Sequence, residues 1–144
     1  MKKRVIALAL SALMVTGLVG CGSDNNSSTS EGSTLKVGMV TDTGTIDDKS
    51  FNQGTWEGIK EAEKSFGLET TFMQPNGESE SSYLTEIQNL YDSGYKFIVT
   101  PGYKFETAIY KAQSQYEDAK FVLIDGEPND GNDNYLVADN TVAV

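Results

Sequence analysis

The segment that decides the fold runs from Leu35 to Phe66 and reads LKVGMVTDTGTIDDKSFNQGTWEGIKEAEKSF. It opens with a short apolar run, passes through a polar turn and then changes to a helical period. The spacing predicts a helix that begins at Ser50, where Ser50 and Gln53 match a capping box, and ends at Gly67. Parallel-sheet proteins bind ligands where strands end and helix N-termini begin, so the loop between these two elements is the first candidate site.

Phe51 occupies the first turn of this predicted helix, beside the loop. Two roles are open to its ring, which either packs the start of the helix or faces a ligand. The preceding Asp47 and Asp48 favour a structural interpretation, because carboxylates near a helix N-terminus stabilise the helix by about 0.3–1 kcal/mol.

The N-terminal part of the chain carries a different signal. Residues 1–20 join a positively charged start to an apolar run that is shorter than the roughly 20 residues of a spanning helix, as is typical of a secretory signal peptide. The run ends in Leu18-Val19-Gly20-Cys21, which resembles the bacterial lipobox and implies cleavage before Cys21 and lipidation of its thiol. An incidental cysteine in an uncleaved anchor is the alternative. Residues 21–34 are rich in Ser, Asn and Gly, which predicts a flexible tether and a lipid-anchored protein on the extracytoplasmic face of the cell membrane.

Composition narrows the function classes. The 144 residues carry a net charge of −10, which argues against binding to nucleic acid, because that requires clustered Lys and Arg. The sequence has no His, the commonest general base and zinc ligand, and its single Cys excludes an intrachain disulfide. The acidic loop at residues 125–134 lacks the spacing of an EF-hand. Carboxylates could still serve as catalytic groups, so composition alone does not exclude an enzyme. Our expectation is that the protein has no cofactor, no metal site and no enzymatic activity.

Strand-like and helix-like segments alternate through residues 35–144. Further strands are predicted at 68–73, 96–100 and 121–124, with a last one starting at 135–138, and helices at 83–93 and 105–116. This alternation predicts an α/β domain with a parallel sheet and helices on both faces. Right-handed crossovers place the C-terminal ends of all strands on one edge, where Asp42, the turn Pro101-Gly102-Tyr103 and Asp125 are expected to converge.

The sequence reaches Val144 soon after the last predicted strand, without a closing helix. We expect residues 35–144 to be the incomplete N-terminal lobe of a larger protein, or of a truncated reading frame. A complete five-stranded domain is the alternative.

Residues 37–58, VGMVTDTGTIDDKSFNQGTWEG, resemble the opening block of the basic membrane protein family. Members of this family are substrate-binding lipoproteins of ABC transporters, and purine nucleoside receptors belong to it. The segments Phe97–Tyr103 and Phe121–Gly126 are similar to later blocks of the family, so the resemblance covers residues 35–144 and the lipobox but no second lobe. It implies a periplasmic-binding-protein-like fold in which two α/β lobes close over a nucleoside.

The resemblance also implies roles for particular residues. Phe51 would stack on one face of the base, Asp42 and Asn52 would hydrogen-bond the ligand at the polar mouth, and Asp125 would accept from a purine N–H. Tyr103 either leans over the ligand or packs against the following helix. Further candidate ligand-binding residues are Ser50, Gly102 and Tyr103. The implied partners are a nucleoside, the ABC permease that receives it and the membrane that holds the lipid anchor.

Three other functions stay open at this point. A receptor for another small ligand, such as a sugar or a quorum-sensing molecule, would use an aromatic platform in the same way. A calcium-dependent nucleoside hydrolase would place Asp42, Asp47 and Asp48 around an ion that activates water. A lipoprotein with a surface-interaction or regulatory role would have no transport partner.

Overall fold

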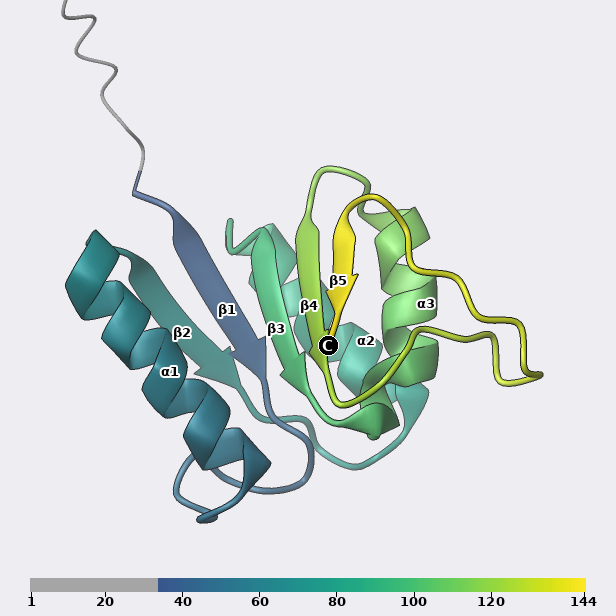
Figure 1. Ribbon diagram of the computed structural model, residues 1–144, viewed down its shortest axis with the longest axis horizontal. Coiled ribbons are helices and arrows are strands. Elements are labelled where there is room, and N and C mark those ends of the chain that lie inside the picture. The colour runs from purple at the N-terminus through teal and green to yellow at the C-terminus, as the bar shows by residue number, and fades with distance from the viewer. Residues whose placement is uncertain (1–33) are drawn as a thin grey trace, which may run out of the picture. The chain divides into compact units, whose positions relative to one another are not determined.

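The computed structural model describes residues 34–144 (Figure 1). The predicted signal peptide, Cys21 and the tether up to residue 33 lie outside the described residues. The elements follow in the order β1 (Lys36–Val40), α1 (Phe51–Phe66), β2 (Glu69–Met73), α2 (Glu80–Asp92), β3 (Phe97–Pro101), the 3-10 helix η1 (Tyr103–Phe105), α3 (Glu106–Gln115), β4 (Lys120–Ile124) and β5 (Thr141–Ala143). None of the helices within 34–144 is both long enough and apolar enough to cross a membrane.

The strands form one sheet in the order β2-β1-β3-β4-β5, and every neighbouring pair is parallel. The predicted α/β class with a parallel sheet is therefore confirmed. Because all strands run the same way, their C-terminal ends share one edge, and the loops after β1, β3 and β4 leave from that edge (Figure 1).

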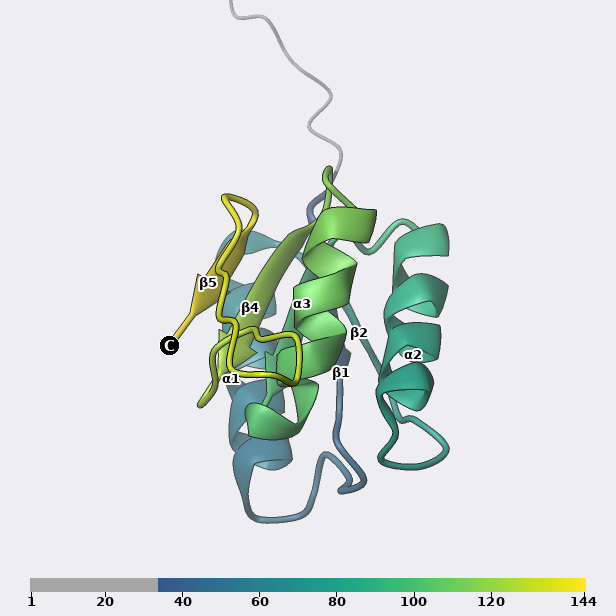
Figure 2. The same cartoon turned by 90° about the vertical axis from the view of Figure 1, so that its right-hand side faces the viewer.

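The two faces of the sheet are covered unequally (Figures 1 and 2). Helices α2 and α3 lie on one face and enclose a large apolar cluster whose centre includes Leu90, Ile109 and Phe121. Helix α1 lies alone on the other face, where a smaller cluster forms from Val37, Met39, Ile59 and Val99. In Figure 1, α1 lies over the β2 and β1 side of the sheet and leaves β3 to β5 open toward the viewer.

The predicted boundaries of α1 are confirmed, but the predicted cap is wrong. The helix begins after Ser50 and ends at Gly67, which adopts the left-handed conformation at φ 67°. The Ser50 side chain makes no capping hydrogen bond. Asp48 takes that role instead, since its Oδ1 accepts from the backbone N–H groups of Ser50 at 2.8 Å and Gln53 at 3.2 Å.

The fifth strand is also displaced from its predicted position. It comprises Thr141–Ala143, whereas the segment at 135–138 forms only an isolated bridge between Tyr135 and Asn129. The side-chain amide of Gln113 explains the difference. It donates to the carbonyl of Leu136 at 2.8 Å and accepts from the N–H of Ala138 at 3.2 Å, so α3 satisfies backbone groups that a strand would offer to the sheet.

Candidate functional site

The strand-end residues selected from the sequence surround one small cavity at the C-terminal edge of the sheet. Its volume is about 140 Å³. The loop after β1 and the start of α1 supply one wall, the turn after β3 supplies a second, and Asp125 after β4 supplies the third. The residues that line the cavity are Asp42, Asp48, Ser50, Phe51, Asn52, Pro101, Gly102, Tyr103, Lys104 and Asp125.

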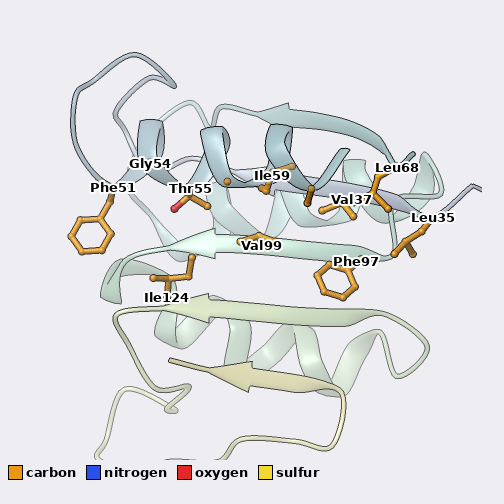
Figure 3. A pocket seen from close by; sticks show the side chains of 12 residues that line it. Leu35, Val37, Phe51, Gly54, Thr55, Ile59, Leu68, Phe97, Val99 and Ile124 are labelled. Atoms are coloured by element: carbon orange, nitrogen blue, oxygen red, sulfur yellow. The ribbon is translucent and has the colours of Figure 1, made fainter. Parts of the chain in front are cut away.

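Phe51 lies at the junction between this cavity and a larger apolar groove. The groove runs between α1 and the sheet, has a volume of about 620 Å³ and is lined almost wholly by apolar side chains. Figure 3 shows Phe51 at the end toward which the strands run, with Leu35 and Leu68 at the opposite end. The ring is 52% exposed, so it does not pack into the core of the described lobe and presents an apolar surface at the mouth of the cavity.

A hydrogen-bonded network fixes the polar wall beside Phe51. Asn52 is 2% exposed, and its Nδ2 donates to Asp42 Oδ1 at 2.7 Å and to Asp48 Oδ2 at 2.8 Å. Its Oδ1 accepts from the backbone N–H of Asp42 at 3.2 Å. Both amide hydrogens of Asn52 are thus committed to the loop, and its place in the structure is that of a residue that orients the two carboxylates.

The conformation of this loop also requires glycine at position 44, which the sequence analysis did not predict. The N–H of Gly44 donates to Asp42 Oδ1 at 2.7 Å. A Cβ atom at this position would lie 2.5 Å from Asn52 Nδ2 and 2.8 Å from Asp48 Oδ2. The close approach of these side chains therefore excludes any larger residue at position 44 without movement of the loop.

The ionisation of Asp48 reflects its structural role. Partial desolvation acts to raise the pKa of this carboxyl, but the hydrogen bonds from the Ser50 and Gln53 backbone and the Asn52 amide outweigh it and hold the pKa below the ordinary value. Asp47 has a simpler environment, with a hydrogen bond from the hydroxyl of Thr45. The structural interpretation of this aspartate pair accounts for the contacts of Asp48.

Lys104 is a cavity residue that the sequence reasoning missed. Its Nζ lies 2.8 Å from Glu78 Oε1 and 3.7 Å from Asp42 Oδ2. The bond to Glu78 raises the pKa of Lys104, and bonds from Lys104 and Thr43 lower the pKa of Glu78. Its position directly after the turn Pro101-Gly102-Tyr103, at a strand end rich in candidate residues, was the signal available in the sequence.

The turn after β3 and the end of β4 complete the lining of the cavity. Gly102 has φ 108°, a conformation that favours glycine, and its N–H donates to the carbonyl of Ile124 at 2.7 Å. Asp125 also adopts a positive φ, of 58°, directly after β4. Tyr103 is 64% exposed, so its ring does not pack into the core beneath α3 and remains free at the rim.

Tyr83, on α2, lies beneath this charged region. It is 1% exposed, and its ring packs against Phe105 with the ring centroids 4.3 Å apart. Its hydroxyl oxygen has no hydrogen-bond partner among residues 34–144. Burial raises the pKa of Tyr83, and the nearby charges of Lys104 and Glu78 have opposing smaller effects on it.

The groups at the cavity are suited to non-covalent recognition. One exposed aromatic ring offers a flat apolar surface, and carboxylate oxygens beside it offer hydrogen-bond acceptors. Within the part of the chain that the structure describes, no three acidic, His or Cys side chains are grouped so as to hold a metal ion.

The family model for ABC transporter substrate-binding proteins of the PnrA-like type, Bmp, matches residues 35–143. The chain belongs to this family. The resemblance seen in the sequence is therefore confirmed, and the match covers every element of the sheet.

Relatives of the Bmp-family chain agree with this assignment. It is 37% identical over 141 residues to the CD4+ T-cell-stimulating antigen of Listeria innocua, an alignment that covers 90% of this chain and 39% of the relative. It is 37% identical over 132 residues to the ABC transporter nucleoside-binding protein BmpA of Lactococcus lactis subsp. cremoris, covering 87% and 37% of the two chains. The chain thus spans about two fifths of the length of these relatives.

A solved structure also matches the fold of this Bmp-family chain. The ABC transporter system solute-binding protein of Aeropyrum pernix K1 superimposes with a TM-score of 0.63 at 25% identity, over 76% of this chain and 28% of the other. The described domain is therefore a periplasmic-binding-protein-like α/β lobe, as the resemblance implied.

Proposed function

We propose that the protein is the lipid-anchored solute receptor of an ABC transporter and that it captures a nucleoside, most suitably a purine nucleoside, at the strand-end cavity. The observation that carries the proposal is the half-exposed ring of Phe51 beside the carboxylates of Asp42 and Asp125 on one cavity. A purine presents a flat apolar face and an edge of donors and acceptors. A ring and neighbouring acceptors match both features.

Each cavity residue has a proposed role. Phe51 stacks on the base, which is worth about 1–3 kcal/mol for a base on an aromatic side chain. Asp42 Oδ2 and the Asp125 carboxylate accept from N–H or O–H groups of the ligand, and Tyr103 and the backbone at Gly102 border it. Asn52 and Ser50 act through the loop, since the Asn52 amide is committed to Asp42 and Asp48.

Delivery to the permease is the second part of the proposal. Lipidation at Cys21 and the tether at 21–34 would hold the receptor at the extracytoplasmic face while the domain moves freely. Ligand would shift the receptor toward a closed form that the permease recognises. Substitution Cys21→Ser is expected to abolish incorporation of labelled palmitate into the protein, and label that persists in Cys21→Ser, or that is absent from the wild type, would contradict lipid anchoring.

Calorimetric titration tests the nucleoside assignment. We expect inosine and guanosine to bind, and hypoxanthine or ribose alone to bind more weakly because each offers only part of the recognised surface. Absence of binding by both inosine and guanosine would contradict the assignment. Preference for pentoses over nucleosides would favour a sugar receptor, and ribose release from inosine in the presence of calcium would favour a hydrolase.

A further inference from the structure

Lys104 lies at the polar end of the cavity, one residue beyond the segment Phe97–Tyr103 on which the family resemblance was noted. Lys104 is the middle residue of η1, just after β3, and its side chain is 33% exposed. Glu78, in the loop after β2, holds its ammonium at 2.8 Å, and the same Glu78 oxygen accepts from the Thr43 hydroxyl at 2.6 Å. The ammonium is therefore held in place by a residue outside the cavity lining, independently of Asp42.

Only one of the two carboxylate oxygens of Asp42, the residue that faces Lys104, accepts hydrogen bonds within the described lobe. Asp42 Oδ1 accepts from Gly44 N–H and from Asn52 Nδ2, both at 2.7 Å. Asp42 Oδ2 has no hydrogen bond among the described residues, and the 3.7 Å to Lys104 Nζ exceeds hydrogen-bond length. Asp42 Oδ2, which can still accept a hydrogen bond, therefore lies next to the Lys104 ammonium, which has N–H groups that can still donate.

We propose that Lys104 and Asp42 form a donor–acceptor pair that reads one group of the ligand, a group that presents a donor and an acceptor side by side. This inference rests on the proposed nucleoside-binding function and specifies which ligand atoms this end of the cavity recognises. Two parts of a nucleoside have this chemistry. They are the N–H beside the C=O of a 6-oxopurine and the 2′ or 3′ hydroxyl of the ribose, which donates and accepts through one oxygen.

The pair also excludes a class of ligand. A phosphate group would accept from Lys104 but would bring its negative charge against Asp42, which lies 3.7 Å from the same ammonium. Asp48 and Asp125 add two further carboxylates to the lining. The cavity accordingly selects neutral ligands with a mixed donor–acceptor group over phosphorylated ones.

Substitutions at Lys104 test the pair by NMR titration of the ¹⁵N-labelled chain. Lys104→Met keeps the apolar stem and removes the ammonium, whereas Lys104→Arg keeps the charge. We expect Lys104→Met to weaken inosine binding about tenfold, because a hydrogen bond to a charged group is lost, and Lys104→Arg to retain part of the affinity. Lys111→Met is the matched control, since Lys111 pairs with Glu80 away from the cavity.

Two inosine analogues show which ligand group is read. Purine riboside lacks the C6 oxygen and the N1 hydrogen, and 2′,3′-dideoxyinosine lacks the 2′ and 3′ hydroxyls of the ribose and keeps the 5′ hydroxyl. The affinity difference between wild type and Lys104→Met should vanish for whichever analogue lacks the contacted group and persist for the other.

The possible failures are separable. If Lys104→Met and Lys111→Met bind inosine as the wild type does, the pair is wrong and the nucleoside receptor stands. If Lys104→Met weakens inosine and both analogues equally, Lys104 acts only by holding the loops, and direct reading is overturned. If inosine perturbs no cavity amide in the wild type, the proposed function fails and the pair fails with it. Wild-type-like spectra of the free variants establish that each is folded.

Discussion

The two faces of the sheet differ in how completely they are covered, and the difference separates stability from recognition. The face under α2 and α3 contains a continuous cluster of buried side chains. The face under α1 contains a small cluster, and a groove of about 620 Å³ remains open along it. The closed face holds the lobe together, and the open face ends at Phe51 and the cavity. We expect substitutions on the closed face to affect folding and substitutions at the cavity to affect binding.

The largest expected effect comes from removing a buried side chain on the closed face. Ile109 on α3 is 0% exposed, and Ile109→Ala should lower the free energy of unfolding by about 2–5 kcal/mol, because it leaves a cavity that the neighbours fill only in part. Ile59→Ala is the matched substitution on the open face, where the side chain is 8% exposed and borders the groove. Its cost should be smaller, and urea denaturation of both variants checks this. Equal losses in the free energy of unfolding for the two variants would contradict the claim that the closed face contributes more to stability.

Phe51→Ala tests whether a substitution at the cavity affects binding more than folding. Because the ring is 52% exposed, its removal should leave the free energy of unfolding within about 0.5 kcal/mol of the wild type. Inosine affinity should fall by about 1–3 kcal/mol, measured by titration. Phe66→Ala is the control, since Phe66 is also exposed but ends α1 far from the cavity in sequence. A variant that unfolds easily yet binds normally would assign Phe51 to packing.

Asp48→Ala sharpens the contrast within the cavity loop. Loss of this cap should lower the free energy of unfolding by about 0.5–2 kcal/mol at neutral pH. The folded-state pKa of Asp48 lies below the ordinary value of 3.8, so its stabilisation is complete above that value and disappears as the pH falls through the folded pKa. Denaturation of wild type and variant between pH 7 and pH 3 should show the difference shrinking below about pH 4. Asp47→Ala, which removes a neighbouring carboxylate that does not cap the helix, should show a smaller loss.

The smallest effect on the free energy of unfolding is expected from removing a hydroxyl group that is buried on the closed face and unpaired within the described lobe. Tyr83 buries a hydroxyl that has no partner among the described residues. Tyr83→Phe should therefore leave the free energy of unfolding unchanged or raise it by up to about 1 kcal/mol, because no hydrogen bond is lost. Thermal denaturation measures the change. A clear destabilisation would mean that the hydroxyl is bonded in solution.

Much of this fold was predictable from the sequence, because its main determinants are local. The alternation of apolar strands with helical periods gave the parallel sheet, and Gly67 marked the end of α1. The convergence of Asp42, Gly102 and Asp125 on one edge followed from chain direction alone. The residues that the sequence predicted for the site do line one cavity, and their role in binding stays a prediction.

The parts that the sequence did not predict depend on contacts between distant residues. The cap fell to Asp48 in place of Ser50 because the loop folds Asp48 over the helix start, where Asn52 holds it. The fifth strand moved because Gln113, more than twenty residues earlier, bonds the segment at 135–138. The role inferred for Lys104 depends on its proximity to Glu78 and Asp42, which lie in two other loops.

An amide-resolved NMR titration of the ¹⁵N-labelled chain with inosine tests the central claim most directly. If the strand-end cavity binds the nucleoside, the largest shifts will occur at the amides of Asp42, Phe51, Gly102 and Asp125. Shifts centred on Leu35 and Leu68, at the far end of the apolar groove, or no shifts at any inosine concentration, would contradict it.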